Sequence, residues 1–148
     1  MEMSMRSFFA AIVCLQLAGC EEFDGEAFRK YLPARYAAAP VVFSKNAWIN
    51  CAIAVFDVSD HDAPLEIEPI PQFTDWAVLP IADQVNDTSI VYRVIGSQNQ
   101  CWASDLIALT GLASSWALAE SFDGLFAYRG SILVIIDSQS NHLYVMEG

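Results

Sequence analysis

Runs of apolar residues along this chain predict the strands of a sheet. Residues 48–58 read WINCAIAVFDV, and apolar side chains occupy both alternating sets, which predicts an inner strand covered on both faces. The unbroken apolar run at 132–136 predicts a second strand of the same kind. Other segments rich in β-branched and aromatic residues predict further strands at 76–80, 88–96, 124–130 and 142–148.

Two segments have the pattern of helices. The main helix is expected at about 103–119, where Ser104 can cap the first turn and apolar residues recur on one face. Residues 23–32 predict an N-terminal helix, with Asp24 as the cap and Pro33 as the stop. The expected fold class is therefore α+β: a mostly antiparallel sheet, with the main helix and the N-terminal helix packed against it.

The first nineteen residues have the order of a secretory signal. Arg6 precedes the apolar stretch 7–15, and the small residues Ala18 and Gly19 follow it. This stretch is about half of the ~20 residues that a transmembrane helix needs, so a spanning segment is disfavoured. Initiation at Met5 would remove the only acidic residue that precedes the apolar stretch.

The tetrad Leu17-Ala18-Gly19-Cys20 resembles the lipobox of bacterial lipoproteins. The resemblance implies that the Cys20 sulfur receives a diacylglycerol and that cleavage removes residues 1–19, leaving 20–148 as a single domain. Alternatives are an ordinary secretory signal with a coincidental cysteine, or a core helix. Leu17 favours the lipobox, because ordinary signal peptidase prefers a small residue at that position. Acylation of Cys20 by more than one chain would give stable anchoring.

The remaining cysteines then form an even set. Cys14 leaves with the signal and Cys20 carries the lipid, so that Cys51 and Cys101 remain in the mature chain. In an oxidising compartment this predicts a disulfide between them. The alternative is two separate buried thiols.

The charge balance narrows the range of partners. The chain has 7 Lys and Arg against 18 Asp and Glu, a formal charge of −11, and this acidity argues against nucleic-acid binding. The lipobox resemblance implies a periplasm-facing protein of a Gram-negative-type envelope. Glu21 follows Cys20 in place of the aspartate that retains some lipoproteins in the inner membrane, which favours the outer membrane.

The candidates for chemistry are few. Asp57, Asp60 and Asp62 supply the oxygen ligands that calcium prefers, but their segment lacks the glycine and ligand spacing of an EF-hand loop. The two histidines are His61 and His142, and no nucleophile elbow, zinc spacing or phosphate-binding glycine loop occurs. The sequence therefore predicts no catalytic residue, metal site or cofactor, and the three aspartates are weak metal candidates.

The expected function is that of a membrane-anchored envelope lipoprotein acting as a non-catalytic binding or scaffolding module. Its partners would be membrane lipid, through Cys20, and an envelope protein. One alternative is a membrane-tethered, hydrolase-like enzyme that uses convergent carboxylates. Another is a calcium-dependent ligand-binding module built on the acidic segment 57–68.

Overall fold

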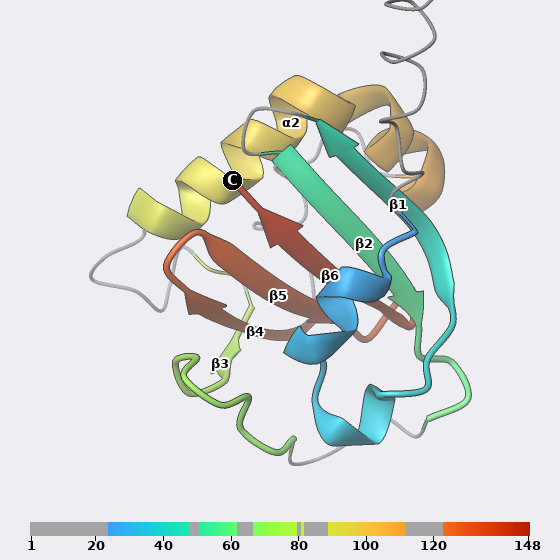
Figure 1. Cartoon of the computed structure of the whole chain (residues 1–148), viewed down its shortest axis with the longest axis vertical. Coiled ribbons are helices and arrows are strands. Elements are labelled where there is room, and N and C mark those ends of the chain that lie inside the picture. The colour runs from blue at the N-terminus through green and yellow to red at the C-terminus, as the bar shows by residue number, and fades with distance from the viewer. Residues whose placement is uncertain (1–23, 48–50, 62–66, 80, 82–88, 112–122) are drawn as a thin grey trace, which may run out of the picture.

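The computed structural model describes residues 24–47, 51–61, 67–79, 81, 89–111 and 123–148. They form one antiparallel six-stranded sheet in the order β1-β2-β6-β5-β4-β3, with the long helix α2 on one face (Figure 1). The elements are η1 (Glu26–Tyr31), η2 (Ala34–Tyr36), β1 (Val41–Ala47), β2 (Cys51–Asp57), β3 (Ala77–Val78), α2 (Ser89–Thr110), β4 (Gly124–Arg129), β5 (Ile132–Asp137) and β6 (His142–Glu147).

The centre of the sheet is buried on both sides, as the sequence predicts for residues 48–58 and 132–136. In β2 every residue from Cys51 to Phe56 is buried, and successive side chains alternate between two apolar clusters. The strands β5 and β6 continue both clusters across the sheet. Two covering layers therefore stabilise one sheet, and neither face of these strands is open to solvent.

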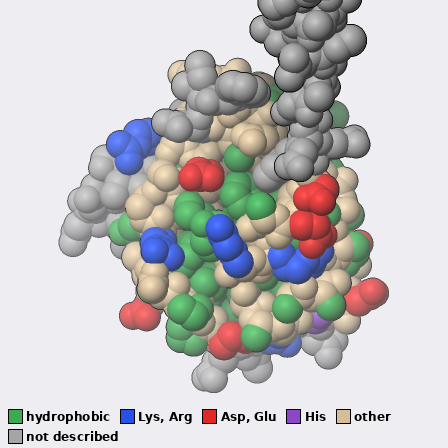
Figure 2. Space-filling view, in the orientation of Figure 1, with side chains coloured by type: hydrophobic (Ala, Val, Ile, Leu, Met, Phe, Trp, Pro, Cys, Tyr) green, Lys and Arg blue, Asp and Glu red, His purple; other side chains and the backbone are tan. Residues whose placement is uncertain are grey.

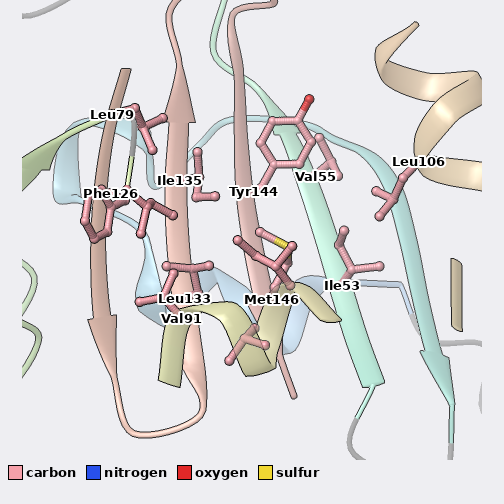
Figure 3. Close-up of a cluster of buried hydrophobic side chains, with 13 residues drawn as sticks. Ile53, Val55, Leu79, Val91, Leu106, Phe126, Leu133, Ile135, Tyr144 and Met146 are labelled. Atoms are coloured by element: carbon pink, nitrogen blue, oxygen red, sulfur yellow. The ribbon is translucent and has the colours of Figure 1, made fainter. Parts of the chain in front are cut away.

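Helix α2 covers one of the two faces (Figure 3). Val91, Val94 and Ile95 stand at helical spacing, are fully buried and pack with β-strand side chains such as Leu133 and Met146. The backbone leaves helical geometry at Trp102, with φ −134° and ψ 20°, so the helix is kinked there. Leu106, which lies beyond the kink, belongs to the same cluster.

The sequence expectation for the main helix is wrong in its position. The helix α2 runs over Ser89–Thr110, and residues 88–96, predicted to be a strand, supply its first turns. Their β-branched residues favour strands locally, but tertiary packing of one buried helical face overrides that preference. Gly111, at φ 69°, lies just beyond the end of the helix, in a backbone conformation that glycine adopts readily. The predicted remainder, 112–119, lies outside the described residues.

The predicted N-terminal α-helix is also wrong. Residues Glu26–Tyr31 form a 3₁₀ helix, because the left-handed Gly25 before it and Pro33 after it leave too few residues for a stable α-helix. Asp24 nevertheless accepts a hydrogen bond from the Glu26 amide at 2.9 Å. Phe28 belongs to the apolar cluster on the face opposite α2. Phe23, the first residue of the predicted helix, lies outside the described residues.

Arg29 holds the turns on this face together. Its guanidinium donates to the carbonyl oxygens of Ala37 at 2.9 Å and Ala39 at 2.7 Å, pairs with Glu26 at 2.6 Å, and lies 5.4 Å from the ring centroid of Phe56. The Arg29 side chain therefore connects three parts of the chain: the helix η1, residues 37–39 before β1, and the strand β2. This arrangement fixes where the chain begins its first strand.

The disulfide expectation is confirmed. Cys51, at the start of β2, is bonded to Cys101 on α2, fifty residues further along the chain. The bond joins the sheet to the helix one residue before the kink at Trp102. The bond therefore holds the helix against β2 at the position where its last turns begin.

Gly25 is required for both its conformation and its size. Its φ is 77°, and a Cβ there would lie 3.0 Å from the Cβ atoms of Ser44 and Ala54. We expect Gly25→Ala to lower the free energy of unfolding by about 2–3 kcal/mol, combining left-handed strain with crowding. Gly130→Ala is the matched control, because Gly130 has φ 55° but no atom within 4 Å of such a Cβ. Urea unfolding of both variants checks this, and equal losses would show that crowding at Gly25 contributes nothing.

Candidate functional site

The predicted acidic segment does not assemble into a cation site in the part of the structure that is described. Asp57 ends β2, and its carboxylate accepts the Ser59 amide at 2.9 Å. Hydrogen bonds from the Ser59 side chain and backbone lower the pKa of Asp57, with a smaller contribution from nearby His142. Asp60 is exposed, and Asp62 lies outside the described residues. Among described residues no group of three His, Cys, Asp or Glu could hold a metal ion.

The sheet register instead aligns three polar residues that are far apart in the sequence. His142 opens β6 and lies opposite Asp57 on β2 and opposite Asp137 on β5. Asp137 is only 1 % exposed, and its two carboxylate oxygens accept the amides of Gln139 at 3.0 Å and Ser140 at 3.1 Å. The buried carboxylate therefore closes the β5–β6 turn. This structural engagement argues against a free acid–base pair at this end of the sheet.

Two buried hydroxyl groups and one imidazole nitrogen lie along the same part of the chain. Tyr144 Oη, Ser140 Oγ and His142 Nδ1 have no hydrogen-bond partner of normal geometry among the described residues. The hydroxyl of Tyr144 points toward one end of its apolar cluster, away from Met146 (Figure 3). Burial raises the pKa of Tyr144 to about 12, opposed by the neighbouring Ser140 hydroxyl and reinforced by the negative charge of Asp137. The phenol is therefore neutral at physiological pH.

This burial predicts a loss of stability in alkali. The pKa of Tyr144 is about 12 in the folded protein, against about 10 in the unfolded chain, so the unfolded state ionises first above pH 10. The Tyr144 contribution is thus fully present below pH 10 and is lost as the pH rises through 12. We expect wild type to lose about 2 kcal/mol more than Tyr144→Phe between pH 9 and pH 11.5, measured by urea unfolding. Parallel losses in the two proteins would contradict a buried, neutral phenol.

A cavity of about 380 Å³ lies at another part of the fold, where α2 meets the ends of β5 and β6. Its lining residues are Arg93, Ser97, Ser131, Glu147 and Gly148. Ser97 Oγ donates to the Arg93 carbonyl at 3.1 Å, and the Gly148 amide donates to the Ser131 carbonyl at 3.1 Å. The volume falls within the range of small-molecule sites, and the guanidinium and hydroxyl groups suit a small polar ligand.

Buried Gln98 fixes the helix wall beside this cavity. The Gln98 side chain is fully buried, and its Nε2 donates to the Glu147 carbonyl at 2.8 Å, joining α2 to the end of β6. The Gln98 Oε1 has no hydrogen-bond partner among the described residues. Sequence reasoning missed this cavity, because its walls come from a helix predicted as a strand, a hairpin turn and the end of the last strand.

The two tryptophans with described side chains, Trp76 and Trp102, are both partly buried. Trp76 is half-buried against the apolar cluster opposite α2, and its Nε1 donates to the Glu68 carbonyl at 3.0 Å. Trp102 packs against the other cluster, with Lys45 Nζ 5.4 Å from its ring centroid. On the face shown in Figure 2, acidic and basic side chains are interspersed among apolar ones, and neither charge gathers into a patch.

No protein family, curated protein or solved structure matches this chain. Cys20, the residue expected to carry the lipid, lies outside the described residues. In the described part of the chain, no helix combines the length and apolar character needed to cross a bilayer.

Proposed function

We propose that this chain is an exported lipoprotein of a Gram-negative-type envelope, anchored by lipid on Cys20 and facing the periplasm. The disulfide between Cys51 and Cys101 is the observation that carries the proposal. Cytosolic thiols are kept reduced, whereas exported proteins form disulfides. The lipobox-like tetrad at residues 17–20 supplies the second line of support, and it also specifies how an exported chain would be retained at the membrane.

We further propose that the anchored domain is a non-catalytic binding or scaffolding module. The support is chemical. The most deeply buried carboxylate of the described region, Asp137, is used to close a turn. The cavity beside Arg93 is lined by one arginine, two serines, Glu147 and Gly148, and its guanidinium and hydroxyl groups can bind a polar group. A polar recess of this kind suits an acidic group or a chain terminus of an envelope partner.

The anchor is tested by replacing single cysteines in the full precursor. In cells fed radiolabelled palmitate, wild type and Cys14→Ser should both incorporate label and partition with membranes, because Cys14 leaves with the signal. Cys20→Ser should incorporate no label, because it lacks the sulfur that accepts the lipid. Label on Cys20→Ser, or its loss from Cys14→Ser alone, would contradict the proposed site.

The binding role is tested at the cavity. We expect small carboxylates such as acetate, and inorganic phosphate, to shift the amide resonances of Ser97 and Ser131 in wild-type protein. Arg93→Gln should abolish these shifts. Arg129→Gln should preserve them, since Arg129 is an exposed arginine on β4 that does not line the cavity. Shifts that survive Arg93→Gln would argue against this cavity as the binding site.

A further inference from the structure

The first described residues place the start of the domain at one edge of the sheet. Gly25 lies over β1 and β2, so close that a Cβ there would be 3.0 Å from the Cβ atoms of Ser44 and Ala54 and 3.2 Å from Val41 Cγ1. Asp24, one residue earlier, is exposed. The strand β1 is one edge of the sheet and β3 is the opposite edge (Figure 1). The polypeptide therefore reaches the folded domain over the first two strands, close to the β1 edge and far from the β3 edge.

The distance from this point to the proposed anchor is limited by covalent geometry. Four peptide steps separate Cys20 from Asp24, so their Cα atoms are at most about 14 Å apart. The opposite edge of the sheet is farther away, because five strand spacings of about 4.8 Å put β3 roughly 24 Å from β1. A domain excluded from the bilayer and held by so short a tether must keep its tethered edge near the lipid.

We propose that the β1 edge of the anchored protein faces the lipid headgroup surface and that the β3 edge faces away from it. This inference rests on the proposed lipid anchor at Cys20. Within the described residues the outer side of β1 has no strand partner, and such an edge is a template for pairing with another chain. The hydrated headgroup layer would cover it without a protein partner. Partners approaching from the periplasm would then meet the side of the domain that carries β3 and β4.

The test compares two exposed valines on the opposite edges. Val42, on β1, is 45 % exposed and Val78, on β3, is 55 % exposed, which makes Val42→Cys and Val78→Cys a matched pair. Each full-length lipidated variant is labelled with a donor fluorophore without reductant, so that the Cys51–Cys101 bond stays closed. Each is then reconstituted into phosphatidylcholine vesicles that contain a lipid with an acceptor on its headgroup.

We expect energy transfer to the membrane acceptor to be at least about twofold more efficient from Val42 than from Val78, given their roughly 24 Å separation across the sheet. Equal or reversed efficiencies in protein whose mass shows the lipid would overturn the proposed orientation and leave the anchor intact. Protein whose mass shows no lipid would instead overturn the proposed function. If Val42→Cys does not fold, Asn46→Cys provides another exposed position on β1.

The alternative is that the β1 edge pairs with the β1 edge of a second copy of the chain. Donor-labelled and acceptor-labelled Val42→Cys proteins, mixed in vesicles without labelled lipid, distinguish the two. Transfer that depends only on random surface density supports the lipid as the cover. Transfer well above that density dependence would mean that two β1 edges pair, and it would overturn the inference.

Discussion

Replacing Cys51 and Cys101 together by alanine should lower the free energy of unfolding by about 4 kcal/mol. The disulfide closes a loop with a sequence separation of fifty residues, so its removal restores considerable freedom to the unfolded chain. Beyond the kink, the described contacts that hold α2 include buried Leu106 and the Lys45–Asp105 ion pair, whose side chains are 41 % and 38 % exposed. A pair so open to water contributes about 1 kcal/mol or less.

Urea unfolding of the double variant, beside oxidised and reduced wild type, measures this effect. Reduced wild type should unfold at nearly the same urea concentration as the double variant, because both lack the same cross-link. A loss below about 1 kcal/mol in both would mean that the cross-link does not restrict the unfolded chain as chain entropy requires. A loss in the variant alone would assign the effect to the alanine side chains.

Ile95→Ala should lower the free energy of unfolding by about 3 kcal/mol, the usual cost of a cavity in a close-packed core. Ile95 is fully buried on α2, whereas Ile107, on the same helix, is 39 % exposed. The same substitution at Ile107 should therefore cost less than about 1 kcal/mol. Because the chemistry is identical at the two positions, the difference reports burial.

A third variant, Val94→Ala, tests a second residue of the buried face of α2. The helix buries Val94 and Ile95 in one cluster beside Val91. Substantial losses for both Val94→Ala and Ile95→Ala are therefore expected. If Ile95→Ala costs no more than Ile107→Ala, the position of α2 on the sheet is contradicted.

The success of sequence reasoning depended on how the apolar residues are distributed. The segments that became β2 and β5 carry apolar side chains in both alternating sets, a pattern that only a strand buried on both faces explains at this length. The edge strand β1 mixes Lys45 and Asn46 with apolar residues, and no strand was predicted there. An edge strand pairs with only one neighbouring strand, so the choice of residues along it is less restricted than in an inner strand.

The error at residues 88–96 has a specific cause. Ile90, Val91, Val94 and Ile95 are β-branched, which favours a strand, but 91, 94 and 95 are also spaced as one face of a helix. The strand preference and the helical spacing fit residues 88–96 equally well. What decides between them is the sheet face that the helix covers and the disulfide at Cys101, and neither is visible in the segment itself.

Among the candidate sites, too, only the one that does not depend on the folded arrangement could be predicted from the sequence. The cysteine pair could be predicted because it needed only a count and a compartment, and the disulfide is present. The alignment of Asp57, His142 and Asp137 needed the register of three strands. The cavity beside Arg93 needed the packing of α2 against the end of β6. Sequence patterns specify neither of these, because register and packing arise from contacts between distant parts of the chain.

The most direct test of the lipoprotein proposal is an intact mass of the protein purified from membranes, with and without reduction and alkylation. The account predicts a chain that begins at Cys20 and carries acyl chains, with two further cysteines that become alkylated only after reduction. A chain that retains residues 1–19, carries no lipid and has free thiols at Cys51 and Cys101 would contradict both the anchor and the exported location.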